Sequence, residues 1–185
     1  MKKLIAGIVV LGLMIPVIHA QKYITKTGEI DIYSETSLFV IEAKNQKVAS
    51  ILNPENGEIV ASTLVRSFKF HEALVEEHFN ENYMQSHDFP KSVFKGKIAN
   101  FSDIDITKDG TYDITIEGNL TMHGETNPVK TSGKLTVKGE NISASTVFEI
   151  SLEAYKIEVE ENYKDRINDN IRLTVHFDYS KMEKK

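Results

Sequence analysis

The chain has 185 residues, with 22 Lys and Arg against 27 Asp and Glu, and it contains no cysteine. The net charge of −5 argues against nucleic acid as a partner, because such binding depends on basic patches that neutralise phosphates. Without cysteine the fold has neither a disulfide nor a thiol nucleophile, and a core of this size needs no covalent cross-link.

The first twenty residues have the pattern of a secretory signal peptide. Lys2 and Lys3 precede an apolar run from Leu4 to Ile15, and the small residue Ala20 follows. The run has about a dozen residues, too few for a helix to cross a bilayer of about 30 Å. We therefore expect cleavage after Ala20 and a single mature domain, residues 21–185, that is periplasmic or secreted. A retained anchor helix is the alternative.

Cleavage makes the chain more acidic. Removing the two signal lysines leaves 20 basic against 27 acidic residues, a net charge near −7. That charge argues against attachment to an anionic membrane surface by electrostatic attraction. We expect no stable membrane anchor and no nucleic-acid partner for the mature protein.

Most of the mature chain alternates apolar and polar residues with a period of two, as strands do. The alternation is most regular in residues 110–124, where Ile114, Ile116 and Leu120 share one face. Turn-forming residues such as those at 53–57 separate the segments. The further strands are expected at 28–34, 38–44, 46–52, 58–66, 92–101, 129–139, 142–155 and 171–179.

About eight or nine strands with short connections suit antiparallel neighbours. A sheet of strands that are apolar on one face must close on itself or fold into a sandwich. We expect an all-β fold, an antiparallel barrel of about eight strands whose interior holds side chains or one slender ligand. Gly96, Gly118 and Gly133 fall inside strands, where they permit a bend or the close approach of a ligand, and packing alone is the alternative.

One short helix is expected at residues 72–85, where the apolar period changes from two to about 3.6. Val75, Phe79 and Tyr83 are spaced by four, and Leu74 lies beside them. We interpret the segment as an amphipathic helix whose apolar side chains plug one end of the barrel.

The same segment holds the densest group of ionisable side chains, which raises the alternative of a metal-dependent or other enzymatic site. His71 and His78 are seven residues apart, about 10.5 Å along a helix, and one metal ion cannot be held by both. His78 and Glu81 form at most a half-site. The sequence has no Gly-x-Ser-x-Gly elbow, phosphate loop or Gly-x-Gly-x-x-Gly. We expect no enzymatic activity, no metal and no cofactor.

The segment EGNLTMHGETNPVKTSGKLTV resembles the signature of the YceI-like family, in which a strand reads Gly-x-Leu-Thr-x-x-Gly-x-Thr-x-Pro-Val. The matching positions are Gly118, Leu120, Thr121, Gly124, Thr126, Pro128 and Val129. The segment HFNENYMQSHDFPKSVFKGKI and the last two strands are similar to the family as well. Two features depart from its pattern. Glu125 stands where the family usually has an apolar residue, and no Arg-Asp pair precedes His78.

The resemblance implies a lipocalin-like barrel that holds a polyisoprenoid chain outside the cytoplasm, as a carrier or store. The ligand would be an isoprenoid lipid of the polyprenyl phosphate type or a quinone. In the alternative, the same apolar side chains pack only as core, and the protein is a ligand-free stress or interaction module. The expected ligand-binding residues, in the barrel interior and lid, are Leu74, Phe79, Tyr83, Phe94, Ile114, Ile116, Leu120, Phe148, Ile150 and Leu173.

The sequence leaves three questions open. It does not name the lipid or its chain length, and it does not decide whether the chain forms a homodimer. It also leaves open whether the barrel mouth tolerates a charged head group, given Glu125.

Overall fold

The computed structural model describes residues 21–182, and the expected signal peptide at 1–20 lies outside them. The described residues form nine strands, each antiparallel to its neighbours. Burial alternates along the last of them, residues 170–181, with the expected period of two. The strands are β1 (Tyr23–Glu35), β2 (Val40–Leu52), β3 (Glu58–Leu64), β4 (Lys69–Phe70), β5 (Lys91–Ile98), β6 (Gly110–Met122), β7 (Glu125–Lys138), β8 (Asn141–Ser151) and β9 (Asn170–Lys181).

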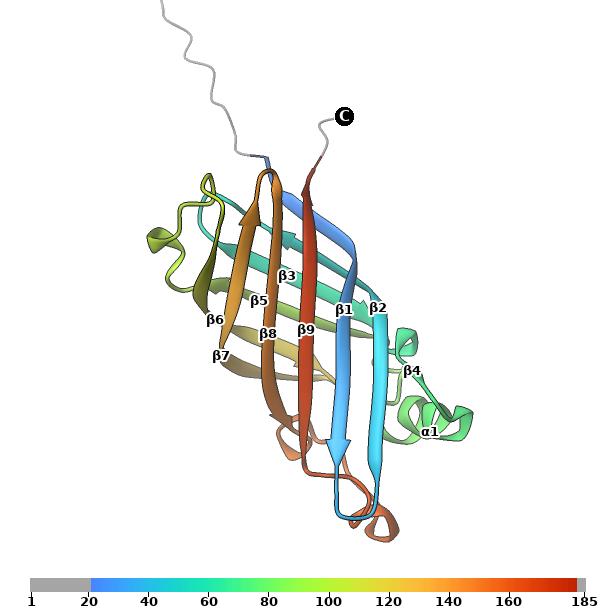
Figure 1. Cartoon of the computed structure of the whole chain (residues 1–185). Coiled ribbons are helices and arrows are strands. Elements are labelled where there is room, and N and C mark those ends of the chain that lie inside the picture. The colour runs from blue at the N-terminus through green and yellow to red at the C-terminus, as the bar shows by residue number, and fades with distance from the viewer. Residues whose placement is uncertain (1–20, 183–185) are drawn as a thin grey trace, which may run out of the picture.

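The strands close into a barrel (Figure 1). The hydrogen-bonded order is β1-β9-β8-β7-β6-β5-β3-β2, and pairing of β1 with β2 completes a ring of eight strands. The two-residue β4 attaches to β2 outside this ring. The predicted antiparallel barrel of about eight strands with one short helix is therefore confirmed.

The two strands expected at 38–44 and 46–52 form one strand, β2. Asn45, the polar residue between them, is buried within it. The side-chain amide of Asn45 donates to the hydroxyl of Thr63 at 2.8 Å and accepts the backbone N–H of Lys47. Strand β1 bulges opposite this point, since Gly28 pairs with Val48 whereas Ile30 pairs with Asn45. A buried amide with partners does not interrupt a strand.

The helical segment begins and ends close to the predicted bounds but changes geometry midway. Helix α1 (Ala73–His78) continues as a π-helical turn, η2 (Phe79–Tyr83), in which the N–H of Met84 donates to the carbonyl of Phe79 at 2.8 Å. Among the described residues, no helix is long and apolar enough to cross a membrane. The remaining short turns are η1 (Val65–Ser67), η3 (Phe101–Asp103), η4 (Glu153–Tyr155) and η5 (Glu161–Tyr163).

The buried apolar side chains form two clusters, one at each end of the barrel. The packed end lies near the start of β1 and the end of β9, at the top of Figure 1. It consists of Tyr23, Val48, Leu52, Ile59, Ala61, Ile98, Ile114, Ile116, Leu135, Val137, Ile142, Ala144, Val175, Phe177 and Tyr179. The hollow end lies near α1 and the hairpin between β1 and β2. It consists of Val65, Met84, Leu120, Met122, Ile150, Tyr155, Ile157, Ile171 and Leu173.

Two glycines let strands β5 and β6 approach closely. Gly96 and Gly118 face each other across the pair, and a Cβ at Gly118 would lie 2.6 Å from the ring of Phe94. Neither glycine lines the cavity described below. Of the two explanations that the sequence leaves open for them, the structure favours packing.

Candidate functional site

The hollow end encloses a cavity of about 640 Å³. That volume falls within the range of about 300–1,000 Å³ typical of small-molecule pockets. Most of the lining is aliphatic or aromatic. The apolar lining residues are Ile30, Ile32, Phe39, Val40, Ile41, Phe68, Phe70, Leu74, Val75, Phe79, Met84, Leu120, Met122, Ile150, Leu152, Ile157, Ile167, Ile171 and Leu173.

Three partly buried side chains separate the cavity from the packed end. Ile30, Phe94 and Phe148 pack against both buried clusters, so they lie at the boundary between the two ends. Beyond them the packed end contains fully buried side chains such as Leu135 and Ile142. An apolar ligand that enters the hollow end therefore meets a floor halfway along the barrel.

Helix α1 and turn η2 cover the cavity as a lid. The ring of Phe79 packs 5.7 Å from that of Phe68 and 4.9 Å from that of Phe70. Tyr83 lines the cavity, and burial raises the pKa of its hydroxyl above the ordinary value of 10.0, so Tyr83 stays neutral. Phe79 and Tyr83 thus present uncharged aromatic rings to the cavity.

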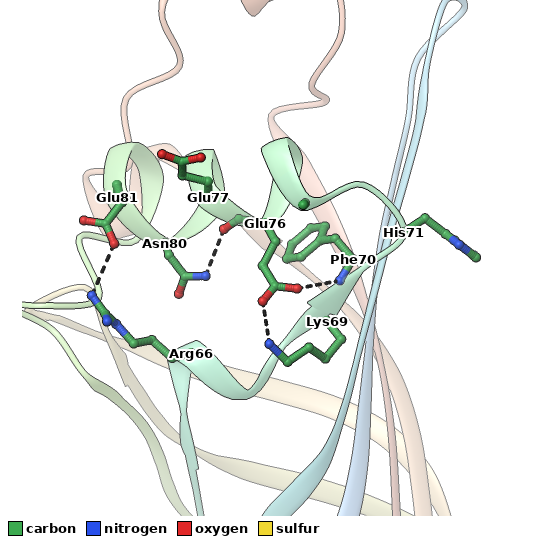
Figure 2. Close-up of a pocket in the computed structure, with 9 residues that line it drawn as sticks. Arg66, Lys69, Phe70, His71, Glu76, Glu77, Asn80 and Glu81 are labelled. Atoms are coloured by element: carbon green, nitrogen blue, oxygen red, sulfur yellow. Dashed lines mark hydrogen bonds and ion pairs between the residues drawn. The ribbon is translucent and has the colours of Figure 1, made fainter.

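Polar contacts fasten the outer side of the lid (Figure 2). The carboxylate of Glu76 accepts hydrogen bonds from the ammonium of Lys69 and from the backbone N–H of Phe70. The bond from Lys69 lowers the pKa of Glu76 below its ordinary value. Arg66 donates to Glu81 at 3.2 Å. These residues border a second, polar hollow of about 520 Å³ on that side.

The polar hollow has the wrong arrangement for the metal half-site considered from the sequence. Its charged groups are mostly neutralised by the pairs Lys69–Glu76 and Arg66–Glu81. Glu81 is therefore paired with Arg66, while His78 lines the apolar cavity on the other side of the lid. Within residues 21–182, no group of three His, Asp or Glu side chains is placed to hold a metal ion.

The exposed lining residues mark the mouth of the cavity. They lie on the hairpin between β1 and β2, just before α1, and at Arg166 in the connection between β8 and β9. Three contacts join these segments in a row. The ring of His78 lies 6.2 Å from that of Tyr163, and the guanidinium of Arg166 lies 5.8 Å from the ring of Tyr163 and 5.0 Å from that of Phe39.

Six of the ten residues predicted as ligand-binding line the cavity: Leu74, Phe79, Tyr83, Leu120, Ile150 and Leu173. The other four are not among the residues that line it. Ile114 and Ile116 belong to the packed end, and Phe94 and Phe148 lie at the boundary. A period of two shows which face of a strand points inward, but not how far along the barrel a residue lies.

Leu74, predicted as a residue of the lid or wall, lies on α1 at the edge of the lid. It is 60% exposed, so it belongs to the rim of the mouth rather than to the inner wall. Leu38, Phe39 and Val40 on the hairpin between β1 and β2 are exposed as well. The mouth is therefore bordered by large apolar side chains from two segments.

The hairpin that carries the family signature has a structural role beside the cavity. Its turn residues His123 and Gly124 have φ values of 50° and 79°, and a type I′ turn requires positive φ at both positions. The His123 ring contacts the carbonyl of Tyr155 at 2.9 Å and the side chain of Gln85 at 3.3 Å. The hairpin thus ties the end of the lid to the connection after β8.

Glu125, which departs from the family pattern, places no charge in the cavity. Its carboxylate pairs with the ammonium of Lys156 at 2.6 Å, and it is not among the lining residues. The charged groups that do reach the cavity are on other segments: Glu42, Glu72 and Arg166.

Sequence reasoning missed the part of the cavity that comes from the connection between β8 and β9. Ile157, Tyr163, Arg166 and Ile167 line the cavity but lie in an irregular segment without apolar periodicity. The available signal was compositional, because Ile157, Tyr163 and Ile167 interrupt a run dominated by charged side chains.

Comparison with known proteins agrees with this architecture. The model of the YceI-like domain matches residues 19–179. A polyisoprenoid binding domain from Saccharophagus degradans, implicated in plant cell wall breakdown, has a TM-score of 0.76 at 9% identity, covering 88% of this chain and 99% of its own. Burkholderia cenocepacia BcnA has a TM-score of 0.69 at 16% identity, covering 83% and 96%.

A YCEI protein from Campylobacter jejuni has a TM-score of 0.56 at 12% identity, covering 99% of this chain and 100% of its own. No curated protein matches the chain. At these identities the solved structures show the shared fold, while the domain model covers nearly the whole described chain. The chain belongs to the YceI-like family.

Proposed function

We propose that the protein is an exported lipid-binding protein that holds a long isoprenoid chain in the hollow end of its barrel, as a carrier or store. The observation that carries the proposal is the apolar cavity of about 640 Å³. The matched domain model and the shared fold of a polyisoprenoid binding domain support an isoprenoid as the ligand.

The chemistry of the lining fits a thin, apolar chain. Burial of each methylene contributes roughly 0.8 kcal/mol, and an aliphatic wall needs no charged partner to supply it. The charged lining residues Glu42, Glu72 and Arg166 are all exposed at the mouth. A tail that enters first therefore meets an uncharged interior, and a polar head remains at the rim.

The cavity also separates this proposal from a barrel filled only by core side chains. Protein interiors are close-packed and contain few voids larger than a water molecule. A volume of about 640 Å³ bordered by Leu120, Ile150 and Leu173 is far larger than a packing defect. Such a space in an apolar wall is suited to an apolar guest.

The decisive experiment compares two tryptophan variants of the exported protein. Leu173→Trp adds bulk inside the cavity, whereas Val147→Trp adds the same side chain on the exposed outer face of β8. Native mass spectrometry of the purified proteins should find an isoprenoid lipid on the parent and on Val147→Trp, and little on Leu173→Trp. Equal lipid on both variants, or a parent that carries no lipid and takes up no added farnesol, would contradict the proposal.

Export is tested separately by N-terminal sequencing. The mature protein should begin at Gln21 and appear in the soluble envelope fraction. Recovery of an intact chain starting at Met1 from the membrane fraction would show that the segment is retained.

A further inference from the structure

The chain has three arginines, and their surroundings differ. Arg66 forms an ion pair with Glu81 outside the lid. Arg172 lies 4.2 Å from the ring of Tyr33 and is outside the cavity lining. Arg166 lines the cavity, and it is the one Lys or Arg among the described lining residues. Among residues 21–182, no carboxylate forms an ion pair with Arg166.

The two aromatic contacts hold the guanidinium of Arg166 at the mouth. Its central carbon lies 5.0 Å from the ring centre of Phe39 and 5.8 Å from that of Tyr163. Cation–π contacts of this kind engage the faces of the planar group and leave its N–H edges free. A guanidinium carries five N–H donors in a fork that matches the oxygens of a phosphate or carboxylate. Arg166 thus presents unused donors to whatever occupies the mouth.

The other charged groups at the mouth are carboxylates, which leaves Arg166 as the position that attracts an anion. Glu42 and Glu72 line the cavity from β2 and from the residue before α1, and Glu160 lies close enough to raise the pKa of Tyr83. A negative group is attracted at Arg166 and repelled by these carboxylates. When the tail occupies the cavity, an anionic head group at the mouth is therefore expected to lie against Arg166.

We propose that Arg166 is the head-group site of the cavity, and that the protein prefers isoprenoids with a phosphate head to isoprenoids that end in a neutral alcohol or quinone. The inference rests on the proposed function, because the tail must occupy the hollow end for the head to reach Arg166. A neutral oxygen also accepts an N–H, but hydrogen bonds between two charged groups are roughly twice as strong as neutral ones.

The test uses farnesyl phosphate and farnesol, which share a tail and differ in the head. Isothermal titration of delipidated protein should show farnesyl phosphate binding roughly ten- to a hundredfold more tightly, as expected for hydrogen bonds to a charged group. Arg166→Met keeps an apolar stem of similar length and should remove most of the preference for farnesyl phosphate, because farnesol loses at most a weaker, neutral hydrogen bond. Arg166→Lys should recover part of the difference in affinity between the two ligands, since it keeps the positive charge but not the planar set of N–H donors.

Arg172→Met is the matched control, because it removes a ring-stacked arginine outside the cavity. It should leave both affinities unchanged. Inorganic phosphate alone should give no binding signal, because it lacks the tail. If phosphate alone binds the parent and not Arg166→Met, Arg166 is a simple anion site that does not need the tail. That result would overturn the inference.

The outcomes separate the two proposals. Equal affinity for the two ligands, or an equal loss of both in a folded Arg166→Met protein, would overturn the head-group inference and leave the lipid-binding function standing. If the parent binds neither ligand, the proposed function fails first. Thermal unfolding of Arg166→Met establishes that the variant is folded.

Discussion

The two ends of the barrel are built from the same strands but are filled differently. Strand β9 contributes Ile171 and Leu173 to the hollow end and Val175, Phe177 and Tyr179 to the packed end. At the packed end the rings of Phe177 and Tyr179 contact each other within the core, and the hydroxyl of Tyr179 shares a buried hydrogen bond with Ser50 at 2.8 Å. At the hollow end aliphatic and aromatic side chains line a cavity of about 640 Å³. The same alternation along the strands therefore accompanies a filled interior at one end and a cavity at the other.

The two ends are also closed in different ways. Phe101, Ile104 and Ile106, which follow β5, pack directly on the packed end. The lid over the hollow end is fastened partly by the exposed pairs Lys69–Glu76 and Arg66–Glu81. Exposed ion pairs contribute about 0–1 kcal/mol each, whereas a buried apolar side chain contributes about 1.5–3 kcal/mol. The two ion pairs are therefore a weaker part of the covering than the packing of Phe79 against Phe68 and Phe70.

The largest expected effect comes from truncating leucine at each end. Leu135→Ala should lower the free energy of unfolding by about 2–5 kcal/mol, because Leu135 is fully buried among packed neighbours. Leu173→Ala should cost less, since one side of Leu173 already faces the cavity. Urea unfolding of the two variants checks this difference. Equal losses would mean that the hollow end is filled as tightly as the packed end.

A larger side chain should affect the two ends differently, with a loss of stability at the packed end and a loss of binding at the hollow end. Ile116→Trp overpacks the packed end and should cost about 1–3 kcal/mol, while farnesol binding by the folded protein is retained. Leu173→Trp places the same ring in existing space and should abolish binding with a smaller loss of stability. Thermal unfolding and farnesol titration on the same samples measure both effects. If Ile116→Trp lost binding without a lower melting temperature, the cavity would have to reach into the packed end.

The smallest expected effect concerns the fastening of the lid. The hydrogen bond from Lys69 holds the pKa of Glu76 below its ordinary 4.5. This contribution is fully present above about pH 4.5 and is lost as the pH falls through the lower pKa of the folded state. Glu76→Gln should therefore speed hydrogen exchange in residues 73–83 at pH 7, by an amount that corresponds to at most about 1 kcal/mol. The difference from the parent should vanish in acid.

Glu77→Gln is the control for that measurement, because it removes the same charge from the next residue of α1, which forms no ion pair among the described residues. Exchange in the lid should be the same as in the parent at both pH values. An equal effect of the two variants would trace the change to the net charge of α1 rather than to the fastening by Lys69.

The sequence predicts the barrel well because alternation along a strand and the spacing of Phe79 and Tyr83 are local properties. It misjudges Asn45, whose burial is made possible by Thr63 on a different strand. It also cannot separate Ile116 from Leu120, which lie on the same face of β6 but at different ends of the barrel. Arg166 escapes prediction because its position at the mouth depends on the ring of Phe39, which is distant in the sequence.

The account rests on the claim that the hollow end, and not the whole interior, receives the isoprenoid tail. Photolabelling with farnesol that carries a diazirine on its terminal isoprene unit tests this directly, because the label reports the residues around the deepest part of the tail. We expect labelled peptides from the lid and from the ends of β6, β8 and β9 that contain Leu120, Ile150 and Leu173. Labels on Leu135 and Ile142 in the packed end, or on the outer-face residue Val147, would contradict the account.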